Sequence, residues 1–407
     1  DVVLRDGVIA AIEPVGSGVA DEVLEYADHV LLPGFVDVHT HLREPGREDA
    51  ETVLTGTQAA ALGGFTAVHA MANTNPVADT AGVVEQVWRL GQEYGYCDVH
   101  PVGAVTVGLD GVQLAELGAM ADSPARVRIF SDDGKCVADA VIMRRALEYV
   151  KAFDGVVAQH AQEPRLTEGA QMNEGEWSGV LGLTGWPAVA EEAIIARDVL
   201  LAEHVGSRVH ICHLSTAGSV EIVRNAKARG IDVTAEVTPH HLLLTDELAA
   251  TYDPVYKVNP PLRTMADVLA VREGLADGTI DAVATDHAPH PHEDKDCEWA
   301  AAAFGMLGLE TALGVVRSAT DLSWREIADR MSVRPAAIAR LSEQGRPIAP
   351  GEPANLVVID QDRAWVVEPR ALASKSTNTP YAQMTMPVSI AATFLRGRPT
   401  VLDGALT

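Results

Sequence analysis

The stretch Phe35–Gly46, FVDVHTHLREPG, places two histidines two residues apart directly after a short apolar run. Side chains at positions i and i+2 share a face only in an extended strand, whereas a helix would place two neighbouring ligands at i and i+4. His39 and His41 can therefore contact one common object only if this segment is a strand. That object would lie at the C-terminal end of the strand, where the apolar run stops.

Short apolar runs of this kind recur along the chain and alternate with Ala-rich stretches of helical periodicity, such as 190–204 and 218–229. Eight strands that alternate with helices predict an α/β protein with a (β/α)8, TIM-like barrel. The alternative is a doubly wound open sheet, which is disfavoured because no Gly-x-Gly-x-x-Gly motif follows the first strand. The predicted strands are 35–41, 66–72, 98–106, 127–132, 156–160, 208–213, 232–237 and 281–286.

The two ends of the chain differ from this central pattern. Residues 2–13 contain two short strand-like runs around an Asp-Gly turn, which is a hairpin signal, and residues 394–404 are similar. We therefore predict a small β domain built from both ends, 1–34 and 347–407, and a catalytic barrel over 35–346.

Composition excludes several classes of partner. The chain has 407 residues, 47% of them hydrophobic, and a formal net charge of −26. Such an acidic surface disfavours nucleic acid and anionic membrane as partners, and it requires local positive charge wherever an anionic substrate binds. The most apolar long segment, 56–72, is interrupted by polar residues and predicts no transmembrane span.

The cysteines and the start of the chain bear on location. Four cysteines (Cys97, Cys136, Cys212 and Cys297) form no C-x-x-C pair, which favours a reducing cytoplasm. No signal-peptide pattern is present. The sequence begins at Asp1 without Met, inside a predicted strand, so we expect further residues to precede it.

Metal-capable side chains end five of the predicted strands. In a barrel these C-terminal ends converge on one face, where active sites lie. The alternative to a functional site is a set of core residues whose polar groups are all hydrogen-bonded. Four histidines and two carboxylates exceed one tetrahedral zinc, and they suit two ions about 3.5–4 Å apart that share a bridging ligand. Imidazole and carboxylate ligands favour Zn²⁺, with Mn²⁺ or Co²⁺ also suitable. The residues are His39, His41, the pair Asp132-Asp133, His160, His213 and Asp286.

The remaining histidines have simpler interpretations. His69, His100 and His210 lie in or beside strands and are expected to pack, and His287 is expected to point away from Asp286. His240 and His241 follow the seventh strand near the barrel mouth. Either could contact substrate or make a structural hydrogen bond.

Seven ordered motifs resemble the dihydroorotases of the amidohydrolase superfamily, in particular the long bacterial type called class I. The resemblance covers essentially the whole chain. The motifs are PGFVDVHTHLREPG (33–46), GGFTAVHAMANTNP (63–76), FSDDG (130–134), HICHLST (210–216), TAEVTPHHLLL (234–244), KVNPPLR (257–263) and ATDHAPH (284–290).

The resemblance implies a role for each metal-capable residue. His39 and His41 would bind the first ion, with Asp286 as a further ligand and general base, and His160 and His213 would bind the second. Many relatives bridge the ions with a carboxylated lysine, but residues 127–134 contain no lysine. This type is implied to use an aspartate of the Asp-Asp-Gly motif, Asp133 by the match rather than Asp132.

The resemblance also implies substrate contacts. Arg43, Asn73 and His290 would hold a ring carboxylate, and Asn259, Phe304 and Gly305 would contact a pyrimidine ring. Two departures from the family pattern are alanines where proline is common, Ala72 before Asn73 and Ala303 before Phe304. Both would loosen a loop without removing a functional side chain.

The implied activity is the reversible cyclisation of N-carbamoyl-L-aspartate to L-dihydroorotate in pyrimidine biosynthesis, through a hydroxide shared by two Zn²⁺ ions. One alternative is another cyclic amidase, such as a hydantoinase or allantoinase, which usually carries the bridging lysine. Another is a non-catalytic partner of aspartate transcarbamoylase, which would lack metal ligands. The resemblance further implies a homo-oligomer and an association with aspartate transcarbamoylase.

Overall fold

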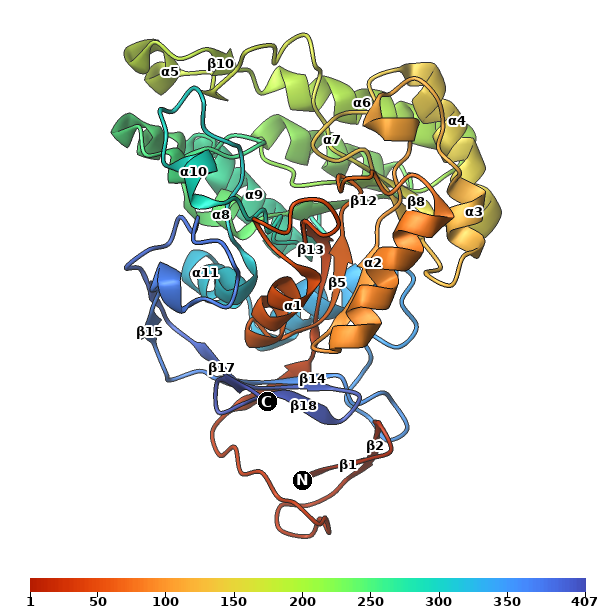
Figure 1. Cartoon of the computed structure of the whole chain (residues 1–407), viewed down its shortest axis with the longest axis vertical. Helices are drawn as coiled ribbons and strands as arrows, with labels where there is room; N and C mark the ends of the chain where they lie inside the picture. Colours follow the sequence, from red (N-terminus) through yellow and green to blue (C-terminus); the bar gives the residue numbers. More distant parts are fainter.

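The computed structural model describes residues 1–407 and contains all eight of the predicted central strands (Figure 1). Every pairing between neighbouring central strands is parallel. The carboxyl ends of these strands therefore point the same way, as the sequence analysis required. The strands are β4 (Phe35–Thr40), β5 (Phe65–Ala70), β6 (Asp98–Pro101), β7 (Ile129–Phe130), β8 (Val156–Gln159), β11 (Val209–Ile211), β12 (Val233–Val237) and β13 (Ala282–Val283).

The central strands form two sheets that are connected at both sides. One sheet has the order β4-β5-β6 and the other has the order β7-β8-β11-β12-β13. A parallel bridge between Gly103 and Phe130 joins the segment after β6 to β7, and a parallel bridge between Thr40 and His287 joins β4 to the segment after β13. Strands that are consecutive in the chain are thus neighbours in space.

Helices follow most of the central strands, which confirms the predicted mixed α/β class. The two stretches with helical periodicity, 190–204 and 218–229, form α6 and α7 with boundaries within one residue. The helices are α1 (Val53–Leu62), α2 (Ala81–Tyr94), α3 (Leu117–Asp122), α4 (Ala140–Val150), α5 (Glu176–Leu181), α6 (Val189–Val205), α7 (Ala217–Ala228), α8 (Pro239–Leu243), α9 (Met265–Asp277), α10 (His292–Lys295), α11 (Ala312–Ala319), α12 (Trp324–Ala328) and α13 (Arg334–Ile338).

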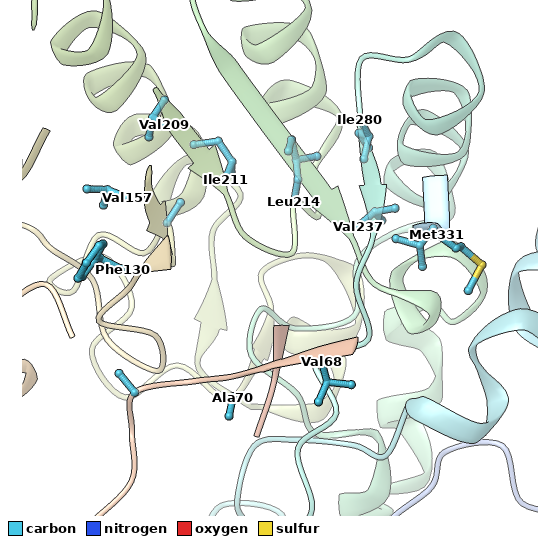
Figure 2. Close-up of a cluster of buried hydrophobic side chains, with 14 of the residues drawn as sticks. Val68, Ala70, Phe130, Val157, Val209, Ile211, Leu214, Val237, Ile280 and Met331 are labelled. Atoms are coloured by element: carbon cyan, nitrogen blue, oxygen red, sulfur yellow. The ribbon is translucent and has the colours of Figure 1, made fainter. Parts of the chain in front are cut away.

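The largest hydrophobic core lies between the central strands and the helices. It contains 62 buried residues, mostly Ala, Val, Leu and Ile. Figure 2 shows part of it, with Val157, Val209, Ile211 and Val237 projecting from three adjacent strands. Small and β-branched side chains suit this position because they pack closely on a pleated surface.

Both chain ends contribute to a separate antiparallel sheet. Its order is β19-β18-β17-β14-β3, from β3 (Val30–Pro33), β14 (Leu356–Asp360), β17 (Ser389–Leu395), β18 (Arg398–Leu402) and β19 (Ala405–Leu406). The predicted N-terminal hairpin is β1 (Val2–Arg5) with β2 (Val8–Ile12). Figure 1 shows this sheet and the hairpin at the same end of the molecule. Short pairs complete the strands: β9 (Met172–Asn173) with β10 (Gly185–Trp186), and β15 (Trp365–Val366) with β16 (Thr385–Met386).

Several strands end earlier than predicted. The predicted strand 98–106 stops at Pro101, and the strand 281–286 stops at Val283. His213 and Asp286 have positive φ angles of 31° and 47°, which no extended strand contains.

None of the helices has both the length and the apolar character needed to cross a bilayer. All four cysteines are free.

Candidate metal centre

A first group of metal-capable side chains lies at the carboxyl end of β4. His39 and His41 project from this end, and Asp133 reaches them from the segment after β7. The Nε2 atoms of His39 and His41 lie 3.3 Å from Oδ1 and from Oδ2 of Asp133, respectively. Asp286, after β13, brings Oδ1 to 3.1 Å from His41 Nε2 and 3.5 Å from His39 Nε2.

A second group shares Asp133 with the first. His160 follows β8 and His213 follows β11. Asp133 Oδ1 lies 3.1 Å from His160 Nδ1 and 3.4 Å from His213 Nε2. All of these side chains are buried. One carboxylate thus contacts two separate histidine pairs, and each pair forms with it a group that could hold a metal ion.

Asp132 has a different environment from its neighbour. Its Oδ1 accepts hydrogen bonds from the backbone N–H groups of Val105 and Thr106, each at 2.9 Å, and its Oδ2 accepts one from the Thr106 hydroxyl at 2.5 Å. Both oxygens are therefore occupied by the loop after β6. Asp133, and not Asp132, lies among the histidines.

The residues present fit a divalent metal. His39 Nε2 is buried without any hydrogen-bond partner, although it points at two carboxylates. A buried polar atom without a partner is costly, and a metal ion would supply that partner. Although burial opposes ionisation, His39 and His160 hold the pKa of Asp133 well below its usual range, so the carboxylate is available as an anionic ligand.

Cys212 also lies beside His39 and Glu236. Burial raises the pKa of its thiol to about 12, so it is no thiolate at neutral pH. The candidate ligands are therefore imidazole and carboxylate groups.

The backbone at this site is unusual. Arg43, His213 and Asp286 have φ angles of 62°, 31° and 47°, in a region that non-glycine residues seldom adopt. Such strain concentrates at functional sites because the surrounding structure must hold it in place. Arg43 lies beyond β4, which ends at Thr40. The alternation of side chains along a strand therefore does not determine where the Arg43 side chain points.

Glu236 on β12 is a residue that the sequence reasoning missed. Its Oε1 lies 2.6 Å from His39 Nδ1, and its Oε2 lies 3.0 Å from His210 Nε2. Although burial opposes ionisation, these histidines hold the pKa of Glu236 far below its usual range. The available signal was an acidic residue inside the apolar run 232–237. His210, expected only to pack, contacts the same carboxylate.

Other polar groups hold the remaining metal-capable histidines. Asn73 Oδ1 lies 2.9 Å from His41 Nδ1. Asn73, expected to contact the substrate, therefore also contacts a metal-capable histidine. Gln162 Oε1 lies 2.9 Å from His160 Nε2 and accepts a hydrogen bond from Asn259 Nδ2 at 3.1 Å. Asn259 Oδ1 is buried and has no partner.

Arg43 and His290 lie together beside this centre. Arg43 Nε donates to the carbonyl of Pro289 at 3.0 Å, and Arg43 Nη2 lies 3.4 Å from His290 Nε2. His290 Nε2 is 2.8 Å from the carbonyl of Phe304, which requires the proton on Nε2. Arg43 Nη2 then has no acceptor at His290, and its N–H groups are free for an anionic ligand. Burial lowers the pKa of Arg43 to about 10, which leaves it charged at neutral pH.

Phe304 and Gly305 complete the same loop. The Phe304 ring packs against Trp186 and lies under Lys257 Nζ, 4.5 Å from the ring centre. Gly305 has a φ of 142°, and a Cβ there would lie 2.8 Å from both Ala288 Cβ and His290 Nε2. Glycine is therefore required at this position, where segment 304–305 approaches segment 288–290.

Of the two histidines left open, His241 is fully engaged by Thr238 and the carbonyls of Pro260 and Pro261. His240 Nε2 is buried and has no partner. His69 and His100 stack on each other with ring centres 5.2 Å apart, and His287 contacts Glu51, so these three have structural surroundings.

Comparison with known proteins identifies the family. Residues 28–219 match the family model described as "Dihydro-orotase-like". The chain is 71% identical to the dihydroorotase of Streptomyces coelicolor over 100% of this chain and 96% of that protein. The dihydroorotase of Mycobacterium tuberculosis is 58% identical over the same shares. This chain belongs to the dihydroorotase family. A dihydroorotase is a cyclic amidohydrolase, so the predicted enzyme class is confirmed.

Solved structures support the fold of this dihydroorotase family member. An L-hydantoinase (dihydropyrimidinase) from Arthrobacter aurescens has a TM-score of 0.88, with 24% identity over 100% of this chain and 93% of that one. A D-hydantoinase has a TM-score of 0.84 with 19% identity, over 100% and 92%. At these identities the likeness concerns the fold alone.

Proposed function

We propose that the candidate metal centre binds two Zn²⁺ ions and interconverts N-carbamoyl-L-aspartate and L-dihydroorotate, a step of pyrimidine biosynthesis. The single observation that carries this proposal is the position of Asp133, whose carboxylate lies between two histidine pairs. His39, His41 and Asp286 would complete the site of one ion, and His160 and His213 that of the other. Mn²⁺ or Co²⁺ would suit the same ligands.

The chemistry divides between the ions and the protein. When bound, two divalent ions lower the pKa of water and polarise an amide carbonyl, which a cyclic amide needs because it is a poor electrophile. Asp286 is the proposed general base, which takes the proton of the attacking water and delivers it to the leaving ring nitrogen. Glu236, Asn73 and Gln162 would orient His39, His41 and His160 through the ring nitrogens opposite those that face Asp133.

The substrate carboxylate would bind to the guanidinium of Arg43, beside His290, whose one N–H group is already donated to the carbonyl of Phe304. The guanidinium offers a planar pair of donors, which suits a carboxylate better than a lysine does. On a chain with a net charge of −26, this local cation is also what an anionic substrate requires. Asn259 and the backbone at Phe304 and Gly305 are the proposed contacts for the ring. Asn73 is proposed to contact the carboxylate as well as to hold His41.

A hydantoinase is the second candidate, because two solved structures that share this fold are hydantoinases. Residues 127–134 contain no lysine to bridge the ions, and the partly buried Arg43 lies beside the centre; both favour dihydroorotase. A non-catalytic partner of aspartate transcarbamoylase is disfavoured because every proposed metal ligand is present.

The test is dihydroorotate hydrolysis by the purified chain, with and without added metal. Ring closure converts two carboxylates into one and consumes a proton. The equilibrium should therefore shift toward dihydroorotate by about tenfold for each pH unit lowered, while both substrate carboxylates remain ionised. An equilibrium ratio that is flat across neutral pH would exclude this reaction.

Several wider features belong to the same proposal. The bridges that join the two central sheets at both sides favour a closed (β/α)8 barrel over 35–346, with a small β domain from 1–34 and 347–407. The four free cysteines favour a reducing cytoplasm. A homo-oligomer and an association with aspartate transcarbamoylase remain predictions, which size-exclusion chromatography of the chain alone and of the mixture would test.

A further inference from the structure

A segment near the C-terminus packs against the loop that carries His290, Phe304 and Gly305. Val367, Tyr381 and Met386 share a hydrophobic cluster with Met306 and Val315. Figure 1 shows the chain around β15 beside α11, away from β14 and β18. Part of the predicted small domain, roughly 365–386, thus lies at the candidate substrate site.

Asn378 is the polar centre of this contact. Its Nδ2 donates to the carbonyls of Ala288 at 3.0 Å and Gly305 at 3.2 Å, and its Oδ1 accepts from the His290 N–H at 3.1 Å. The Asn378 carbonyl also accepts from the Leu307 N–H at 3.2 Å. Both amide donors and the amide oxygen are therefore used, and the residue is only 6% exposed.

These contacts hold both arms of the loop at once. Ala288 and His290 flank Pro289, whose carbonyl fixes Arg43 Nε. Gly305 follows Phe304, whose carbonyl fixes the His290 ring. The Asn378 amide therefore sets the spacing between segment 288–290, whose Pro289 carbonyl holds Arg43, and segment 304–305, whose Phe304 carbonyl holds the His290 ring.

We propose that Asn378 is a positioning residue for recognition of the ring carboxylate of the substrate, which rests on the proposed function above. A displacement of about 1 Å in a binding group can cost up to 10²-fold in rate. Loss of the amide would free the two arms and misplace Arg43 and His290 relative to the metal centre. The effect should fall on recognition of the carboxylate and leave the metal ligands intact.

Asn378→Asp is the sharpest variant. Aspartate keeps the shape and the acceptor for the His290 N–H, but it places an anion against two carbonyl oxygens that previously accepted hydrogen bonds. Asn378→Ser is a milder variant that keeps one donor. The control is Asn355→Ala, because Asn355 is 5% exposed and its side chain also hydrogen-bonds to backbone groups, of Glu343 and Arg396 in the end-sheet region.

The measurement is kcat/KM for dihydroorotate and for dihydrouracil, which lacks the carboxylate, together with metal content and Tm. We expect the preference for dihydroorotate to fall by about tenfold or more in Asn378→Asp, mainly through KM, with unchanged metal content. Asn355→Ala should lower Tm and keep the preference.

A folded Asn378→Asp or Asn378→Ser protein with the wild-type preference would overturn the proposal. An equal loss of preference in Asn355→Ala would also overturn it. So would unfolding of both Asn378 variants while Asn355→Ala remains folded, since Asn378 would then act only on stability. Wild-type protein that does not hydrolyse dihydroorotate would instead overturn the proposed function.

Discussion

Glu236 Oε1 lies 2.6 Å from Nδ1 of His39, and the same carboxylate contacts His210 through its other oxygen. Since the Glu236 carboxylate accepts this hydrogen bond, Nδ1 of His39 carries a proton, and Nε2 is the ring nitrogen that faces Asp133 and Asp286. A carboxylate behind a metal-binding histidine both orients the ring and increases its basicity. The position of His39 thus depends on β12, about 200 residues away in the chain.

Glu236→Gln should therefore weaken metal binding. Loss of such an orienting partner typically costs about 10–100-fold in metal affinity or activity. Competition with a chelator, monitored by metal analysis, measures the affinity directly. Glu191→Gln is the matched control, since Glu191 is also buried but contacts Ser215 rather than a metal-capable histidine. Equal metal affinities in the two variants would remove Glu236 from this role.

The metal content should approach two ions per chain. His160→Asn should reduce it to about one, because only the second site loses a ligand, and Asp133→Ala should reduce it further, because both sites do. His240→Asn should retain both ions. Elemental analysis of protein purified without chelator gives these numbers. Full activity at a saturating content of one ion would rule out the binuclear centre.

Asp286→Asn should remain folded and lose at least about 10²–10⁴-fold in kcat, the usual contribution of a general base. Asparagine keeps the size and one oxygen near His41, but it cannot accept a proton at neutral pH. Stopped assays with unchanged metal content and Tm would isolate the proton transfer. Near-normal turnover would place the base elsewhere.

Arg43→Met should reduce kcat/KM for dihydroorotate by roughly tenfold to a hundredfold, since a hydrogen bond to a charged group contributes about 1.5–3 kcal/mol. Dihydrouracil should be affected little. Arg89→Met removes the same charge from the surface of α2 and should change neither value. If wild-type protein hydrolyses both compounds equally well, no carboxylate clamp exists and the hydantoinase alternative gains support.

Glu310 predicts a pH dependence of stability. Burial raises the pKa of its carboxyl group to about 7, with a smaller contribution from Glu51, although the Ala373 N–H stabilises the anion. The folded protein then holds more protons than the unfolded chain between about pH 4.5 and 7, so its stability falls as pH rises through that window. Glu310→Gln should remove this pH-dependent loss of unfolding free energy, about 1–3 kcal/mol. Denaturant unfolding of both proteins at pH 5 and 8 measures it, and parallel profiles would refute the assignment.

The sequence alone determined where the central strands lie, although several of them end earlier than predicted. The spacing of His39 and His41 required an extended segment, and β4 covers this stretch up to Thr40. The hairpin 2–13 and the helices 190–204 and 218–229 were equally legible. Period two, period 3.6 and turn residues are local properties, so a single chain displays them without knowledge of its partners.

Only the tertiary structure decided which of these residues act together. Asp132 and Asp133 are adjacent and chemically equal, and they differ because the loop after β6 occupies both oxygens of Asp132. The roles proposed for Glu236 and Asn378 rest on hydrogen bonds to residues far away in the chain. Such bonds depend on a few tenths of an ångström between elements, and that distance is set by the packing of the whole core rather than by any local pattern.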